Sequence, residues 1–169
     1  MTVNKARDAR EVLEFYHDLI DKMKDSPVRP TWTKGVYPCL ESLQAALEAG
    51  NLFTAEEDGR VVGAVIVTAE QDEAYSRVPW ALATDRVAVI HLLAADPARH
   101  RSGIGTRLLE KAREVARERG AEAIRLDTLP YNTPARRLYE AFGFQYRGDL
   151  ELYYPSAGRI PFSMYEYLL

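Results

Sequence analysis

Residues 100–106 form a glycine-rich turn that could hold a phosphate group. The turn reads His100-Arg101-Ser102-Gly103-Ile104-Gly105-Thr106. Glycine lets a ligand approach the backbone closely, and the first turn of a helix leaves unpaired N–H groups that attract anions. The turn lacks the third glycine of a dinucleotide loop and the Gly-Lys-Ser/Thr of a nucleoside-triphosphate loop. Two interpretations therefore stay open: a phosphate site, or a tight turn that packs a helix on a sheet.

A strand and a helix must flank this turn. Residues 87–95 have the β-branched, two-sided apolar character of a buried strand. From Gly103 to a stop at Gly120, apolar residues recur at helical spacing. They are Ile104, Leu108, Leu109, Ala112, Val115 and Ala116. Another strand is predicted at 122–128, and because a helix joins the two strands, they must be parallel.

The rest of the chain alternates helices with strands. Helices are predicted behind Asp8 to about residue 24, at 40–49, and from Thr133 as N-cap to a stop at Gly143. Strands are predicted at 51–57 and 60–69, joined by an Asp-Gly turn, and at 144–153 and 162–168. No repeat or linker interrupts this order. We expect a single α/β domain over residues 1–169, with a central mixed β-sheet flanked by helices.

The composition excludes several classes of protein. With 22 basic and 25 acidic residues and no block of like charge, a nucleic-acid partner is disfavoured. The single Cys39 excludes an internal disulfide and fits a reducing compartment, and the three histidines and one cysteine lack the spacing of metal ligands. The longest apolar run, residues 61–67, is too short to cross a bilayer, and the N-terminus lacks a signal core. We expect a soluble, cytoplasmic protein without metal or membrane partner.

From residue 87 to residue 144 the sequence resembles the GNAT family of acetyl-CoA-dependent N-acyltransferases. The family motif Arg/Gln-x-x-Gly-x-Gly/Ala is matched by residues 100–105, with His100 in the first position. A second block, an Asn, a Tyr seven residues later and then Gly-Phe, is matched by Asn132, Tyr139 and Gly143-Phe144. The resemblance implies a GNAT fold with two splayed parallel central strands. It also implies acetyl-CoA as co-substrate and a primary amine as acceptor, on a small amine, an amino acid or a peptide N-terminus.

The resemblance assigns a cofactor site as well. The pantetheine arm would take main-chain hydrogen bonds from Leu93, Ala94 and Ala95, and the pyrophosphate would bind the turn at 100–106. Asn132 and Tyr139 complete the implied cofactor site. A plainer explanation of the two alanines is that they make room for a packed helix.

Three residues are candidates for proton transfer. Tyr139 matches the general acid of the family, and its alternative is a core tyrosine. Asp127 occupies the place of a glutamate base in ribosomal-protein N-terminal acetyltransferases, although it could instead brace the loop at 128–132. His91 occupies the place of an active-site histidine in arylalkylamine N-acetyltransferases. A pKa of about 6.5 suits a base, but a lone histidine in an apolar strand is more often a hydrogen-bonded core residue.

Aromatic residues on loops are the candidates for the acceptor site. They are Trp32, Tyr37, Tyr75, Trp80 and Tyr131. Each could instead anchor its loop by packing. The last strand, 162–168, could pair across a homodimer. Two other functions stay open: a non-catalytic acyl-CoA-binding sensor of the same fold, and a different nucleotide-binding α/β enzyme.

Overall fold

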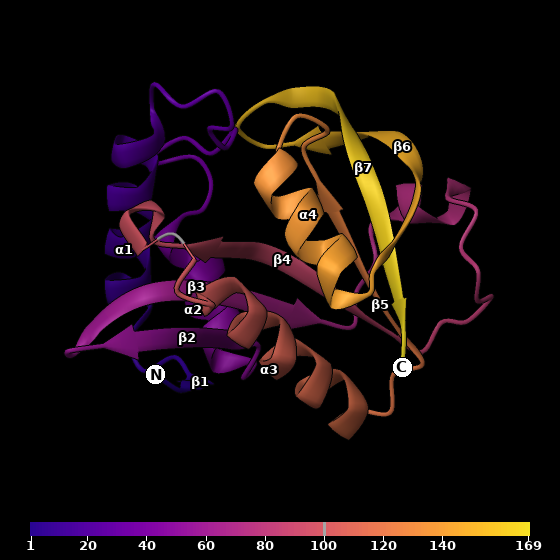
Figure 1. Cartoon of the computed structure of the whole chain (residues 1–169), viewed down its shortest axis with the longest axis horizontal. Helices are drawn as coiled ribbons and strands as arrows, with labels where there is room; N and C mark the ends of the chain where they lie inside the picture. The colour runs from indigo at the N-terminus through magenta and orange to yellow at the C-terminus, as the bar shows by residue number, and fades with distance from the viewer. Residues whose placement is uncertain (100) are drawn as a thin grey trace.

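The computed structural model describes residues 1–99 and 101–169 and contains a seven-stranded mixed sheet with helices on both faces (Figure 1). The strands are β1 (Val3–Lys5), β2 (Leu52–Glu57), β3 (Arg60–Thr68), β4 (Val87–Ala95), β5 (Ala123–Thr128), β6 (Gln145–Tyr154) and β7 (Gly158–Leu168). The helices are α1 (Ala9–Met23), α2 (Leu40–Glu48), α3 (Ile104–Glu118) and α4 (Thr133–Phe142), with short 3-10 helices η1 (Glu73–Arg77) and η2 (Pro97–Arg99). The predicted α/β class is confirmed, and β1 and the two 3-10 helices are additions.

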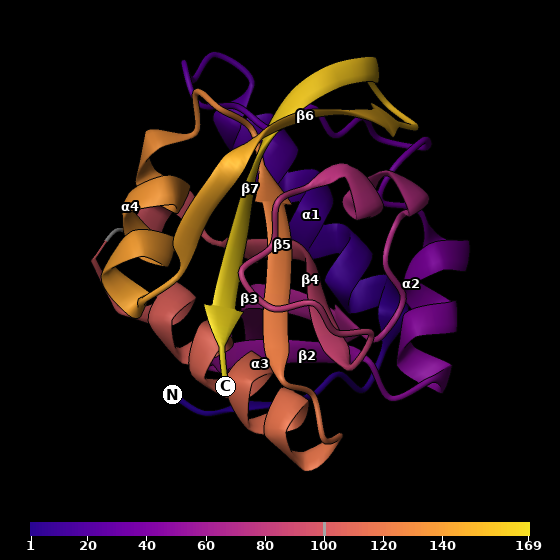
Figure 2. The ribbon, with the colours of Figure 1, turned by 90° about the vertical axis from the view of Figure 1, so that its right-hand side faces the viewer.

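The sheet divides where its two parallel strands meet. The strand order is β1-β2-β3-β4-β5-β7-β6, and β4 and β5 are its parallel pair, as predicted. Their ladder joins residues 87–90 to residues 123–126. Beyond it β4 turns away from β5, which leaves a wedge between the carboxyl ends of the two strands (Figures 1 and 2). A ligand site is expected at such an opening.

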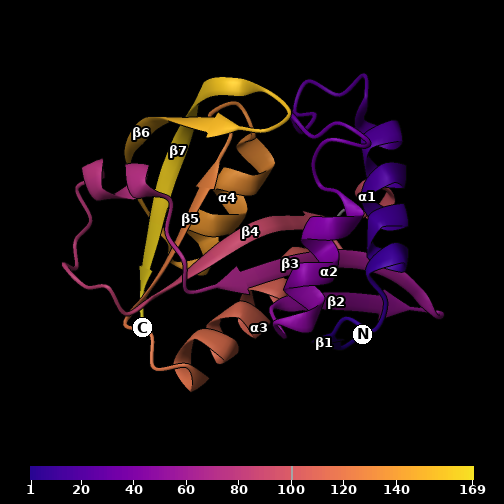
Figure 3. The same cartoon turned by 180° about the vertical axis from the view of Figure 1, so that it is seen from behind.

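Helices α3 and α4 cover one face of the sheet, and α1 and α2 cover the other (Figure 3). The six apolar residues predicted for one stripe of α3 are all buried. Helix α3 can pack close to β3 because Gly63 has no side chain. A Cβ atom at Gly63 would stand only 2.6 Å from Cγ2 of Ile104. No helix of the described residues is long and apolar enough to cross a membrane.

Two details differ from the prediction. The N-cap of α4 is Asn132 rather than Thr133, because the Asn132 Oδ1 accepts a hydrogen bond of 3.3 Å from the Ala135 N–H. The last strand begins at Gly158, earlier than predicted, and lies between β5 and β6. Both of its sides are therefore paired, and the edges of the sheet are β1 and β6. A homodimer built by pairing of the last strand loses its structural basis.

Candidate active site

A cavity of about 610 Å³ opens at the wedge between β4 and β5. Its walls come from the carboxyl ends of these strands, the turn before α3, the first turns of α3 and α4, and the loop near residue 30. Most of the predicted site residues line it together: Trp32, His91, 93–95, 101–106, Asp127, Asn132 and Tyr139. His100, also predicted for the cofactor site, lies outside the described residues.

The turn before α3 has the geometry of an anion cradle. Arg101 and Gly103 both adopt the left-handed conformation, with φ values of 62° and 77°. Gly103 is the N-cap of α3, and no side chain caps the helix there. The first intrahelical bond runs from the Arg107 N–H to the Gly103 carbonyl, so the N–H groups of residues 104–106 have no intrahelical partner. A Cβ atom at Gly103 would meet nothing within 4 Å, so the space beside the turn is open.

Strand β4 carries a bulge where it leaves β5. Its register with β3 shifts between Ala64 and Ile66, and Leu92 has a φ of 52°, which is strained for a leucine. The fully buried Tyr16 of α1 donates a hydrogen bond of 2.5 Å to the Leu92 carbonyl. A side chain 76 positions away thus holds the strained backbone that borders the cavity.

Asp127 lies on β5 at the wedge and is paired with a tyrosine. The Tyr75 hydroxyl donates a hydrogen bond of 2.6 Å to Oδ2 of Asp127. Burial raises the pKa of Asp127 to about 6, because it penalises the ionised form. The hydrogen bond from Tyr75 opposes this rise, and the charge of Asp72 adds to it. A carboxyl group with a pKa near 6 is ionised at pH 7 and can take up a proton.

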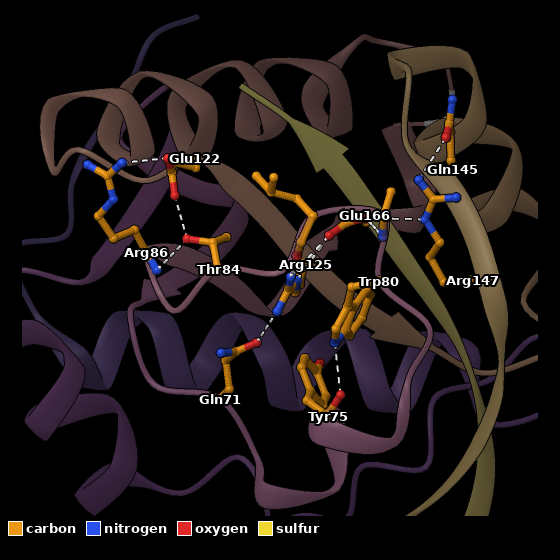
Figure 4. Close-up of polar contacts among 12 residues, drawn as sticks. Gln71, Tyr75, Trp80, Thr84, Arg86, Glu122, Arg125, Gln145, Arg147 and Glu166 are labelled. Carbon is orange, nitrogen blue, oxygen red and sulfur yellow. Dashed lines mark hydrogen bonds and ion pairs between the residues drawn. The ribbon is translucent and has the colours of Figure 1, made fainter.

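Tyr75 is held in place by a buried charge cluster around Arg125 and Glu166 (Figure 4). Arg125 lies two residues before Asp127 on β5, so the two side chains point to the same face of the sheet. Arg125 donates to Glu166 at 3.2 Å, to the Gln71 amide at 2.7 Å and to the Leu82 carbonyl at 2.6 Å. Its guanidinium also lies 4.4 Å from the ring centre of Trp80, whose indole N–H donates to the Tyr75 carbonyl at 2.8 Å. These contacts fix the connection at residues 71–82 against the sheet.

Tyr139 approaches the cavity from the opposite face. It is buried on α4, and its ring lies 5.9 Å from those of Phe144 and Tyr165. It shares a core cluster with Leu126, whereas Asp127 points to the other face, because neighbouring strand residues alternate. Burial, and then the charge of Asp127, raises the pKa of Tyr139, so its hydroxyl keeps its proton at neutral pH.

His91 also borders the cavity, on the bulged part of β4. Its Nε2 lies 3.2 Å from the Thr68 hydroxyl oxygen. Burial lowers the pKa of His91, and the charge of Glu70 opposes this shift less strongly. The imidazole is therefore neutral at pH 7 and is tied to a neighbouring strand.

The aromatic candidates for the acceptor site separate into two groups. Trp32 lines the cavity, and four others lie outside the lining: Tyr37, Tyr75, Trp80 and Tyr131. Tyr75 acts on the cavity through Asp127, whereas the Tyr131 hydroxyl donates to the Arg29 carbonyl at 3.2 Å. Tyr154 and Phe162, which were not predicted, line the cavity from β6 and β7. Nothing local in the sequence distinguishes them from other aromatic residues of strands.

The chain matches the model of the Acetyltransferase (GNAT) family over residues 14–144. A mycothiol acetyltransferase of Thermomonospora curvata is 29% identical over 126 residues, which are 71% of this chain and 36% of that protein. The chain spans about a third of the length of the curated mycothiol acetyltransferases that it matches.

Solved structures show the same fold. A Staphylococcus aureus Mu50 acetyltransferase structure has a TM-score of 0.70 and 25% identity, and the match covers 99% of this chain and 97% of the other. A Salmonella typhimurium acetyltransferase, solved with its cofactor acetyl-CoA, has a TM-score of 0.73 and 18% identity. The match covers 100% of this chain and 94% of the other.

Proposed function

The chain belongs to the GNAT acetyltransferase family, and we propose that it transfers the acetyl group of acetyl-CoA directly to a primary amine. One observation carries the proposal. A single cavity joins the anion cradle at Gly103, the carboxylate of Asp127 and the protonated Tyr139. These are the groups that acetyl transfer to an amine requires: a phosphate anchor, a base and an acid.

The cavity fits the coenzyme in two respects. The N–H groups of residues 104–106, which have no intrahelical partner, and the left-handed turn before them suit a pyrophosphate, as helix N-termini with adjacent glycine turns do. The edge of β4 that faces away from β3 has no β5 partner beyond Ile90, so the backbone at 93–95 is free to bond an extended arm. Bound there, acetyl-CoA supplies the thioester carbonyl carbon that the amine attacks.

Asp127 is proposed as the base on the acceptor side. An alkylammonium has a pKa of about 10.4 and must lose its proton before it can attack. The raised pKa of Asp127, about 6, reduces the difference between the pKa values of the ammonium group and of the carboxyl group that accepts its proton. Tyr75 occupies Oδ2 of this lining residue, which leaves the second carboxylate oxygen, Oδ1, as the proposed proton acceptor. His91, neutral and tied to Thr68, is the alternative base, acting directly or through a water.

Two further groups of this chain act on the developing charges. In the proposed reaction, backbone N–H groups at the splayed part of β4 stabilise the thioester oxygen, as in other acyl-transfer sites. Tyr139, which keeps its proton at neutral pH, donates that proton to the departing thiolate. Because Asp127 and Tyr139 lie on opposite faces of the sheet, base and acid act from opposite sides of the wedge.

A panel of amines incubated with acetyl-CoA and the whole chain tests the proposal. Thiol release and the mass of acetylated product are measured, and desulfo-CoA and ATP compete for the site. We expect turnover with at least one amine and displacement by desulfo-CoA alone. Tight binding without turnover would instead indicate a sensor module, and displacement by ATP would indicate another nucleotide enzyme.

A further inference from the structure

Three aromatic side chains form one wall of the cavity on the face where Asp127 points. Trp32 comes from the loop after α1, and Tyr154 and Phe162 come from β6 and β7. The Trp32 indole N–H donates to the Tyr154 hydroxyl at 3.1 Å, and the rings of Tyr154 and Phe162 lie 5.4 Å apart. The Tyr37 ring packs edge-on against Tyr154 at 5.1 Å from outside the lining. The indole N–H of Trp32 is therefore already satisfied, and the wall is built of aromatic rings.

Charged groups are distributed unevenly along the described lining. Asp96, Arg99 and Arg101 belong to the end near the turn before α3. Asp96 pairs with Lys22 at 3.1 Å, and Arg99 pairs with Glu57. On the aromatic side, Asp127 is the charged residue of the described lining, and His91, which also lines the cavity, is neutral.

The groups around Asp127 add no cation to this end of the cavity. Arg125, two residues earlier on the same face, directs its guanidinium to Glu166, Gln71 and the Leu82 carbonyl. Asp72 is exposed, and its carboxylate accepts a hydrogen bond from the Ala74 N–H. On the aromatic side, a carboxylate entering with the acceptor would thus meet Asp127 and no cation of the described lining, because Arg101 belongs to the other end of the cavity, near the turn before α3.

Building on the proposed function, we propose that the acceptor is a small monoamine that carries an aromatic group and no free carboxylate. Its ammonium group pairs with Asp127, and its ring packs against Trp32, Tyr154 and Phe162. A cation beside aromatic faces is favoured, and a ring fills an apolar wall better than an alkyl chain does. A carboxylate on the acceptor would be left unpaired beside the aromatic wall, which is costly. A second ammonium group would likewise lack a partner there.

A matched series of acceptors tests this substrate class on the unmodified chain. The probes are 2-phenylethylamine, L-phenylalanine, its methyl ester and 1,4-diaminobutane. We expect kcat/KM for 2-phenylethylamine and for the ester to exceed that for L-phenylalanine by at least about 100-fold, because a site rejects a group that it leaves unpaired. We expect at least about tenfold over 1,4-diaminobutane, because that probe has no ring and adds an unpaired charge. If kcat/KM for L-phenylalanine or for 1,4-diaminobutane equals that for 2-phenylethylamine, the inference is wrong.

Two neighbouring tyrosines of β6 provide a variant and its control. Tyr154→Leu removes a ring of the aromatic wall, whereas Tyr153→Leu changes an exposed residue outside the lining. We expect the KM for 2-phenylethylamine to rise about tenfold in the first variant, with the Kd for acetyl-CoA and all constants of the second unchanged. Tyr154→Phe, which keeps the ring, should retain most of the affinity if the larger change impairs folding. Equal losses in Tyr154→Leu and Tyr153→Leu would contradict the inference.

Calorimetric titration of the whole chain with 2-phenylethylamine separates the two proposals. If acetyl-CoA binds but none of the aromatic amines binds or reacts, the substrate class is wrong and the proposed function stands. If acetyl-CoA does not bind, the proposed function fails. Stronger binding of 2-phenylethylamine than of L-phenylalanine would in that case still support the monoamine site.

Discussion

The hydroxyl of Tyr75 lies 2.6 Å from Oδ2 of Asp127, across 52 positions of sequence. Because it donates to the ionised carboxylate, this hydrogen bond lowers the pKa of Asp127, against the larger rise that burial causes. The pKa of the proposed base is therefore raised by burial and by the charge of Asp72 and lowered by the hydrogen bond from Tyr75, and this last effect can be removed by deleting a single oxygen atom.

The first prediction concerns the pH dependence of the reaction. Asp127 must be ionised to accept a proton, so kcat/KM should fall as the pH drops through about 6. In Tyr75→Phe the carboxylate loses a donor, its pKa rises, and this acidic limb should move to higher pH. Rate profiles from pH 5 to 9 measure both. An unchanged limb in Tyr75→Phe would mean that Asp127 is not the titrating base.

The second prediction concerns stability. The folded pKa of Asp127, about 6, exceeds the ordinary value of 3.8, so ionisation destabilises the folded state. The cost is absent below about pH 3, where the carboxyl is protonated in both states, and complete above about pH 6. Asp127→Asn, which mimics the protonated form, should therefore stabilise the chain by about 2–3 kcal/mol at pH 8 and by almost nothing near about pH 3. Urea unfolding at the two pH values tests this difference, and an equal effect at both would refute it.

Tyr139→Phe tests the proposed acid. The substitution keeps the ring that packs against Phe144 and Tyr165, and it removes the proton donor. We expect kcat to fall about 100-fold, in the range typical of general acid catalysis, while the Kd for acetyl-CoA stays nearly unchanged. Single-turnover rates and titration of the coenzyme measure the two effects. A parallel loss of coenzyme affinity would make this tyrosine a structural residue.

The two ends of α3 offer a matched pair of glycines. Gly103 and Gly120 have φ values of 77° and 73°, and a Cβ atom at either would meet nothing within 4 Å. Replacement by alanine should cost roughly 1 kcal/mol of stability at both positions, because the strain is the same. Only Gly103→Ala, in the turn that lines the cavity, should weaken acetyl-CoA binding, by about tenfold. Comparable binding in the two variants would place the pyrophosphate elsewhere.

A fifth prediction compares a buried and an exposed arginine. Arg125 pairs with the buried Glu166 and fixes the connection that carries Tyr75, whereas Arg86 pairs with Glu122 at the surface. Arg125→Met should cost about 3 kcal/mol or more, because it leaves polar groups buried without partners. Arg86→Met should cost less than about 1 kcal/mol. Chemical denaturation of the two variants measures the contrast, and similar values would argue against a structural role of the cluster.

The periodicity of apolar residues was sufficient to predict the helices and strands whose buried faces follow a regular spacing. The six buried residues of α3 follow the helical period, and the parallel pair β4 and β5 follows from the helix between them. Adjacent capping residues were harder to order: Asn132 and Thr133 can both cap a helix, and only the backbone conformation decides between them.

The rest of the site depends on contacts between distant segments. Tyr75 and Asp127 are 52 positions apart, and Tyr16 and Leu92 are 76 apart, so no local pattern relates them. The left-handed conformation of Leu92 has no signal in the sequence, because leucine rarely adopts it. The aromatic wall likewise depends on how β6 and β7 fold over the cavity, which sets Tyr154 beside Trp32.

The ladder between β4 and β5 spans only residues 87–90 and 123–126, so the four strands of one half-sheet and the three of the other share a short seam. A coenzyme arm bound in the wedge would extend this pairing as an added strand does, because the amide groups of the arm would form hydrogen bonds with the strand backbone. When acetyl-CoA binds, the backbone amide hydrogens next to this short ladder should then exchange more slowly in both halves of the sheet. The bound coenzyme would in this way stabilise the contact between the two half-sheets as well as react.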